Sequence, residues 1–289
     1  MALNIEKLFS NLSCKLVNIE GFNHHVQFES SGISSRFMFF SGIHLDEKGA
    51  SVALKNWFEK NESVIPDTLK VFQANPESLK RKKRGVTRWT WHGPEIIDAN
   101  RYFGNERGNY WVAEEIKTIA AQHPNLKCAF SFHEEADKKG YREKDDGRIE
   151  TFIRDPNSFY MYDAFNAEES TSDEIMPLYN SLASALTKQG FSLYSGFDDY
   201  KNDPKETVQL NPVDNGYCPQ ASDKNNFLDG SFENWVITQG MKRSFVFEIP
   251  SRISEERKQL MIKIIFEKFI IPFLNQVCPD LNLPNIGID

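Results

Sequence analysis

The sequence predicts an α/β fold in which helices cover both faces of one sheet. Short β-rich segments alternate along the chain with segments of helical periodicity, an order that is typical of such a sheet. The chain has 289 residues, which suits one large α/β domain or two small ones. Because no internal repeat and no low-complexity linker divides it, we expect a single domain over residues 1–289.

Six segments are predicted to be strands. The two earliest alternate apolar and polar residues, whereas the third and the fifth are mainly apolar runs that are typical of buried strands. A strand pattern also precedes the last helix. The predicted strands cover residues 15–22, 25–30, 36–43, 68–75, 126–133 and 242–249.

Four segments are predicted to be helices, over residues 47–60, 108–124, 174–190 and 254–277. The second should end before Pro124, and the third should be closed by Gly190. Ser254 followed by two glutamates indicates the start of the fourth helix. Residues 138–157 are highly charged without a clear period and indicate a long excursion loop, and residues 198–229 are similarly irregular.

The composition is that of an ordinary globular protein and argues against several classes of partner. Hydrophobic residues make up 40% and charged residues 26% of the chain, and the net charge is −7. We therefore expect no nucleic-acid partner and no membrane partner, and the short basic run at residues 80–85 is interpreted as a solvated loop. The N-terminus has no secretion-signal pattern and the four cysteines form no CxxC pair, which favours a cytoplasmic location.

Two of the predicted strands end on a histidine, His44 and His133. Ligands of open α/β sheets bind outside the carboxyl ends of the strands, so both histidines are expected at the functional edge. A single histidine there is usually structural, but two at equivalent positions favour a site. Glu47 follows His44 by one helical turn, and a His₂Glu set suits a catalytic zinc, which leaves a fourth position for water.

Further polar residues accompany this set along the chain. Asn100 and Arg101 lie on a predicted strand-end loop, and a basic segment with Arg81 and Arg84 precedes them. Glu248 lies among apolar residues of the last predicted strand, where a carboxylate is costly unless it is paired or functional.

Together these segments resemble the zinc metallocarboxypeptidases of the carboxypeptidase A-like family, from about His44 to Glu248. The resemblance rests on "GIHLDEKG", "DANRYF", "AFSFHEEAD" and "GSFENW" through "GMKRSFVFEI", in this order. It implies a central mixed, twisted sheet and one catalytic domain. It also implies one Zn²⁺ ion held by His44, Glu47 and His133, with Glu248 as general base and later acid. The "HEEAD" form is more similar to bacterial cytosolic members than to digestive ones.

The resemblance implies substrate-binding roles as well. Arg101 would bind the terminal carboxylate of a peptide, with a hydrogen bond from Asn100, and Arg81 would stabilise the oxyanion, although Arg84 or Arg88 could do so instead. Tyr217 is the candidate for the family's mobile tyrosine, provided that there is an insertion near Asn225. Glu233 corresponds to the floor of the side-chain pocket and would favour terminal lysine or arginine, but it could equally face solvent.

Three functions follow as hypotheses. The first is a zinc metallocarboxypeptidase that hydrolyses the C-terminal peptide bond of peptides through a metal-activated water. The second is a zinc-dependent N-acyl amino acid deacylase, similar to aspartoacylase and succinylglutamate desuccinylase, whose small amide substrate also carries a free carboxylate. The third is an inactive module that binds peptide C-termini. A second metal near Glu134, Glu135 or Asp137 is left open, as are the physiological substrate and the oligomeric state.

Overall fold

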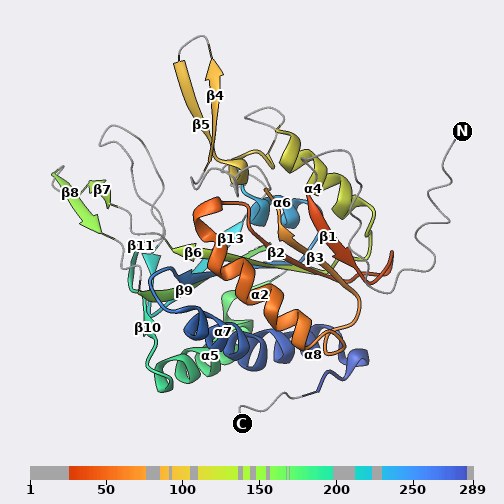
Figure 1. Ribbon diagram of the computed structural model, residues 1–289. Helices are drawn as coiled ribbons and strands as arrows, with labels where there is room; N and C mark the ends of the chain where they lie inside the picture. Colours follow the sequence, from red (N-terminus) through yellow and green to blue (C-terminus); the bar gives the residue numbers. More distant parts are fainter. Residues whose placement is uncertain are drawn as a thin grey trace, which may run out of the picture.

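The computed structural model describes most of the chain, with gaps at the N-terminus and in several loops. The described residues are 26–75, 85–90, 93–104, 110–135, 139–143, 148–153, 157–166, 168, 170–197, 212–222 and 230–284. They form a central sheet with helices above and below it, and two narrow hairpins project from this body (Figure 1).

In the described part of the chain, the central sheet has eight strands and is mixed. β3, β2, β6 and β14 run parallel to one another, whereas β1 and β9 are antiparallel to their neighbours β3 and β14. β10 and β13 both extend the sheet beyond β9 and run parallel to it. The order is β1 (Gln27–Ser30), β3 (Thr68–Gln73), β2 (Phe37–Ser41), β6 (Cys128–Glu135), β14 (Arg243–Pro250), β9 (Ser158–Asn166) and β10 (Ser192–Leu193), with β13 (Tyr217–Ser222) also beside β9.

Helices cover both faces of this sheet (Figure 1). One face is covered by α2 (Lys48–Lys60), α5 (Met176–Lys188), α7 (Glu255–Ile265), the π-helical turn η4 (Phe266–Ile270) and α8 (Ile271–Val277). The other face is covered by α4 (Trp111–Ala121) and α6 (Phe232–Thr238). The predicted α/β fold, with a mixed sheet between two helical layers, is therefore confirmed. Among the described residues, no helix has both the length and the apolar character needed to cross a bilayer.

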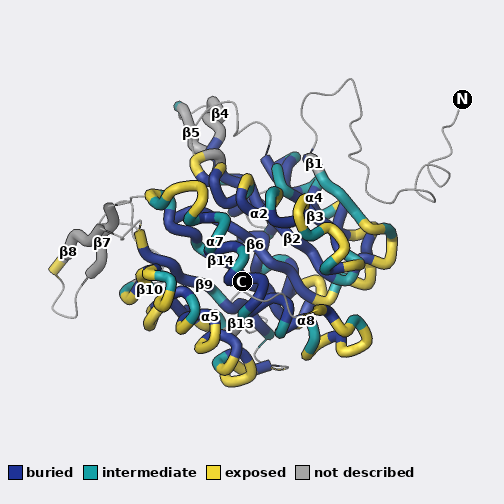
Figure 2. The backbone as a smooth tube through the Cα atoms, turned by 60° about the horizontal axis from the view of Figure 1, so that its bottom comes forward, coloured by how far each residue is buried: buried dark blue, intermediate teal, exposed yellow. Residues whose placement is uncertain are grey.

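The central strands are buried on both sides (Figure 2). In β2, Phe37 and Phe39 pack into the cluster beneath α2 and α7, whereas Met38 and Phe40 pack toward α4 and α6. Such a strand reads as a continuous apolar run because successive side chains point to opposite faces and both faces need covering. β6 follows the same alternation, and its apolar run ends at His133 on the α6 side.

The predicted helix ends agree with local chemistry. The Oγ of Ser254 accepts a hydrogen bond from the backbone N–H of Arg257 at 3.3 Å, which caps α7 as expected. Gly190 has a φ of 73°, the left-handed conformation that commonly follows a helix and that glycine adopts without steric cost. The predicted last helix is one continuous helical segment, α7–η4–α8, with the π-helical turn in its middle.

Several elements were not predicted as such. The segment predicted to be an excursion loop contains a hairpin, and strands also occur in the segment predicted to be irregular. A second hairpin precedes residue 98, and β9 and α6 were not predicted either. The predicted first strand, residues 15–22, lies outside the described residues. The remaining elements are β4 (Val86–Thr90), β5 (Gly93–Ile97), β7 (Lys139–Glu143), β8 (Ile149–Ile153), β11 (Gly196–Phe197), β12 (Pro212–Val213), η1 (Leu45–Glu47), η2 (Ala99–Arg101), η3 (Ser172–Glu174) and η5 (Pro279–Leu281).

Candidate metal centre

The turn after β2 delivers His44 and Glu47 to the carboxyl edge of the sheet. Gly42 begins this turn with a φ of 74°, and a Cβ atom there would lie 2.8 Å from the carbonyl oxygen of Phe72. Only glycine therefore allows β2 to turn so close to β3. His44 is extended, with φ −105° and ψ 142°, and η1 follows at once and places Glu47 beside it.

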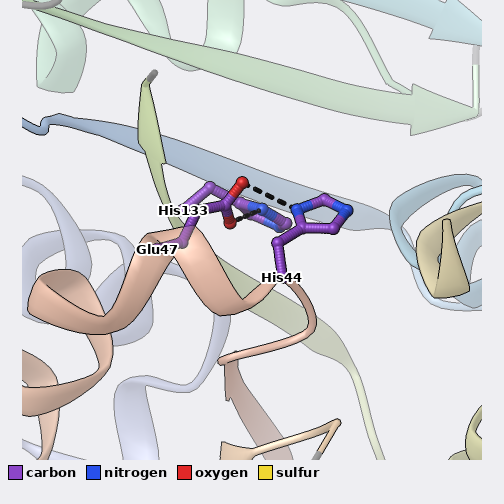
Figure 3. A group of neighbouring side chains, drawn as sticks. All are labelled: His44, Glu47 and His133. Carbon is purple, nitrogen blue, oxygen red and sulfur yellow. Dashed lines mark hydrogen bonds and ion pairs between the residues drawn. The ribbon is translucent and has the colours of Figure 1, made fainter. Parts of the chain in front are cut away.

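His133 reaches the same point from the end of β6, and Glu47 lies between the two imidazoles (Figure 3). The Nδ1 atom of His44 lies 2.7 Å from Oε1 of Glu47, and the Nδ1 atom of His133 lies 2.7 Å from Oε2. One donor atom from each residue falls within 4.8 Å of the others. The exposed fractions are only 1%, 2% and 3%, so water competes little for these polar atoms.

The outer nitrogen of each imidazole also contacts a carboxylate. The Nε2 atom of His44 lies 2.8 Å from Oδ1 of Asp98, which comes directly after β5. The Nε2 atom of His133 lies 3.3 Å from Oε1 of Glu233 on α6. A carboxylate that accepts from Nε2–H leaves the lone pair of the neutral imidazole on Nδ1, which faces the centre. Asp98 was missed by sequence reasoning, although it is the first residue of the "DANR" segment.

Burial and charge oppose each other at this centre. Burial disfavours the charged form of Glu47, but the adjacent His44 and His133 outweigh it and hold the pKa of Glu47 well below its ordinary 4.5. Burial likewise opposes a charged His133, but the carboxylate of Glu47 and the hydrogen bond to Glu233 raise its pKa well above 6.5. The cluster is thus held together by charge in a nearly dry environment.

Glu248 lies on the neighbouring strand. In the parallel pairing of β14 with β6, Glu248 is directly opposite His133, so the two side chains leave the same face of the sheet. Glu248 is also half-buried, in contrast to the fully buried residues on either side of it in β14. The negative charge of Glu248 further raises the pKa of His133.

Asn100 and Arg101 lie on η2, next to Asp98. Asn100 is buried with both ends of its amide engaged: Nδ2 donates to Oε2 of Glu233 at 3.2 Å, and Oδ1 accepts from the backbone N–H of Phe232 at 2.9 Å. Arg101 is half-buried and donates from Nη1 to the carbonyl oxygen of Asn100 at 3.2 Å. The hydrogen bond from Asn100 to a substrate stays a prediction, since the Nδ2 group carries two N–H donors and Glu233 accepts from one.

Of the two predicted positions of Glu233, the solvent-facing one is wrong, and the pocket floor stays a prediction. The side chain is 6% exposed and bonded to His133 and Asn100. Burial opposes ionisation of Glu233, but the hydrogen bond and the charge of His133 lower its pKa to about 2. Glu233 therefore belongs to the support of the histidine cluster.

Tyr217 does not fit the predicted role of a mobile tyrosine. It is buried in β13 on the sheet face covered by α5, and its ring lies 4.9 Å from that of Tyr179. Its hydroxyl donates to Oδ2 of Asp163 at 2.8 Å. His133, on the opposite face, belongs to the histidine cluster, so Tyr217 cannot close over that cluster without leaving the core.

The remaining predicted residues divide into two groups. Arg81, Arg84 and Asp137 lie outside the described residues, and only the backbone of Arg88, in β4, is described. Glu134 and Glu135 are buried and bonded within the protein: Oε1 of Glu134 lies 2.5 Å from Nζ of Lys258, and Oε2 of Glu135 accepts from the hydroxyl of Tyr160 at 2.5 Å.

The donor set fits a metal ion of the zinc class. Zinc favours imidazole nitrogen and carboxylate oxygen, and its catalytic sites use three protein ligands with an outer shell that orients the histidines. Both Nδ1 atoms face one carboxylate, and both Nε2 atoms are held by other carboxylates. In the described part of the chain, this is the one group of three such donors that lie close enough together to hold a metal ion.

Comparisons with known proteins support the fold. No model of a known protein family matches the chain, and no curated protein matches it either. Three crystal structures of candidate metallopeptidases are similar in fold. They come from Shewanella amazonensis (TM-score 0.57, 15% identity, 88% of this chain and 83% of the other), Shewanella denitrificans (0.56, 16%, 90% and 82%) and Shewanella baltica (0.54, 12%, 86% and 81%). At these identities the likeness establishes the fold alone.

Proposed function

We propose that the protein is a zinc-dependent carboxypeptidase with one catalytic domain, which hydrolyses the C-terminal peptide bond of peptides. The observation that carries this proposal is the buried convergence of His44, Glu47 and His133, with Glu248 opposite His133 on the next strand. The fold shared with candidate metallopeptidases from Shewanella supports it. His44, Glu47 and His133 would hold one Zn²⁺ ion.

The residues divide the chemistry between them. A zinc ion, when bound, would act as a Lewis acid that polarises the scissile carbonyl and lowers the pKa of its bound water toward neutrality. Glu248 takes a proton from the attacking water and then delivers it to the leaving amine. Glu248 is half-buried, so water can reach its carboxylate, whereas the residues on either side of it in β14 are buried and apolar.

The enzyme would bind its substrate through the terminal carboxylate of the peptide. Arg101 suits this role because a guanidinium binds a carboxylate with two parallel hydrogen bonds, and because η2 places it next to the Asp98 that contacts His44. A second arginine, Arg81 or else Arg84 or Arg88, would stabilise the developing oxyanion. Capture of a free carboxylate would make the enzyme an exopeptidase.

The proposal is tested by replacing Glu248 with glutamine in the zinc-loaded chain. We expect Glu248→Gln to keep its zinc but to lose about 10²–10⁴-fold in kcat, because the amide cannot accept the proton. Glu59→Gln is the matched control, since Glu59 is an exposed glutamate at the far end of α2. Full activity of Glu248→Gln would refute the assigned role.

A small substrate panel separates the peptidase from its alternative. Dipeptides and N-acyl amino acids with the same terminal residue present the same carboxylate but different acyl groups. We expect the dipeptides to be hydrolysed faster. Turnover of the N-acyl amino acids alone would identify a deacylase and overturn the peptidase proposal.

A further inference from the structure

A closed ring of hydrogen bonds runs through the three candidate metal ligands and their neighbours. It passes from His44 through Glu47 to His133, then through Glu233, Asn100 and Asp98 back to His44. The six distances between the bonded atoms are 2.7, 2.7, 3.3, 3.2, 3.0 and 2.8 Å, in that order. The members come from four separate segments of the chain, namely the β2–α2 turn, β6, α6 and the segment around η2.

Glu233 is the link that ties α6 into this ring. Its Oε1 atom faces Nε2 of His133, and the Oγ atom of Ser131 lies 2.9 Å from the same nitrogen. Its Oε2 atom accepts from Asn100. Both oxygens of this buried carboxylate thus have partners inside the protein, and neither has to find one in a substrate.

The first turn of α6 is built to hold Glu233 in this place. The Oγ atom of Ser231 caps the helix by accepting from the N–H of Asn234 at 3.3 Å. The backbone N–H of Phe232, the first residue of α6, donates to Oδ1 of Asn100. Gly230, with a φ of 71°, lies against the backbone of Arg101, where a Cβ atom would collide with the Arg101 carbonyl oxygen. The helix therefore docks directly onto η2.

We propose that Glu233, held by Asn100, is a positioning residue that fixes the ring orientation and tautomer of His133, as Asp98 does for His44. This inference rests on the proposed function, because it assumes that Nδ1 of His133 binds the metal. It reassigns both residues, since Glu233 and Asn100 then support the ligands and do not select the substrate. The substrate carboxylate is left to arginine.

The hydrogen-bond pattern offers a sharp test. In Glu233→Gln the new amide can accept from His133 only if its NH₂ group turns toward the NH₂ group of Asn100, so two donors face each other. Replacing Asn100 with aspartate at the same time restores a donor opposite an acceptor, while the second Asp oxygen still accepts from the N–H of Phe232. The double variant Asn100→Asp/Glu233→Gln also keeps the net charge of the ring.

The experiment measures zinc affinity of the metal-free full chain by competition with a chelator, and the absorption spectrum of the Co²⁺ form. We expect Glu233→Gln to bind zinc about 10–100-fold more weakly and to shift the Co²⁺ spectrum. The double variant should recover part of the affinity. Glu59→Gln should match the wild type, and Glu233→Gln should leave unchanged the ratio of kcat/KM for peptides ending in lysine to that for peptides ending in phenylalanine.

Two results would overturn the inference. If Glu233→Gln binds zinc as tightly as the wild type and instead lowers the ratio of kcat/KM for peptides ending in lysine to that for peptides ending in phenylalanine, then Glu233 is a pocket floor. If the double variant is weaker than Glu233→Gln, then the pairing with Asn100 does not position His133. Both differ from failure of the proposed function, in which the wild-type chain itself would bind no zinc or would hydrolyse no peptide.

Discussion

Glu47 and His133 form a buried pair although they are 86 residues apart in the chain, with Oε2 of Glu47 2.7 Å from Nδ1 of His133. The pair joins the first turn after β2 to the end of β6. Without a metal, a proton on Nδ1 holds the two groups together, and a metal ion must displace that proton. The pair therefore makes both stability and metal binding sensitive to pH.

The first prediction concerns the stability of the metal-free chain. The pKa of Glu47 is held below 4.5, so its contribution is present above pH 4.5 and is lost as the pH falls through the lowered value. The pKa of His133 is raised above 6.5, so its contribution is complete below pH 6.5 and is lost as the pH rises through the raised value. We therefore expect the free energy of unfolding to fall as the pH rises above 6.5.

Urea denaturation with a chelator present, from about pH 5 to about pH 9, measures this dependence. His133→Gln is the control, because it cannot take up the proton. The same slope in His133→Gln as in the wild type would assign the pH dependence to another group. With saturating zinc, the trend above pH 6.5 should reverse, since a metal competes with protons for the same nitrogen.

The second prediction is that Gly49→Ala destabilises the protein. Alanine normally stabilises a helix interior by about 1 kcal/mol relative to glycine. At Gly49, however, a Cβ atom would collide with the buried ion pair of Glu134 and Lys258, and Oε2 of Glu134 also accepts from the Gly49 N–H at 2.8 Å. We expect a net loss of about 1–3 kcal/mol, the usual cost of overpacking.

Thermal or urea unfolding of Gly49→Ala checks this loss, and Asn56→Ala in the same helix is the comparison. Asn56 is half-exposed, so its replacement should be neutral or slightly stabilising. A gain of stability in Gly49→Ala would mean that the ion pair moves aside without cost.

The third prediction separates Tyr217 from catalysis. Tyr217→Phe removes a hydrogen bond to Asp163, whose Oδ2 atom also accepts from Arg243 at 2.6 Å. A hydrogen bond to a charged group contributes about 1.5–3 kcal/mol to stability, so the free energy of unfolding should fall by that amount. The value of kcat/KM should stay within about twofold of the wild type, because Tyr217 packs on the face of the sheet opposite the histidine cluster. Large loss of kcat with unchanged stability would restore the mobile-tyrosine role.

Much of the fold could be predicted from the sequence because buried strands and helices place apolar residues at regular positions in the chain. The apolar runs ending at Ser41 and His133 are strands covered on both faces, and the amphipathic segments became α2, α4, α5 and α7. β9 was missed because its buried Tyr160 and Asp163 and its half-buried Tyr162 interrupt the apolar pattern. β7 and β8 are only five residues long each, and charge obscures their alternation.

The candidate site was predictable in part, for a related reason. His44, Glu47 and His133 stand at strand and helix ends, where spacing and the parallel order of strands bring them together. The orientation of Glu233 was not predictable, because it depends on how α6 docks on η2, a contact between residues more than 130 positions apart. Asp98 was missed because an aspartate before a short turn has many ordinary roles.

The central claim of the proposed function is that the buried cluster binds a metal ion. Calorimetric titration of the metal-free full chain with Zn²⁺, in the wild type, Glu47→Gln and Glu59→Gln, tests it most directly. We expect one ion per chain for the wild type and Glu59→Gln, and binding by Glu47→Gln weakened by more than the roughly 100-fold that an outer partner costs. No binding by the wild type, or equal binding by Glu47→Gln, would contradict the claim.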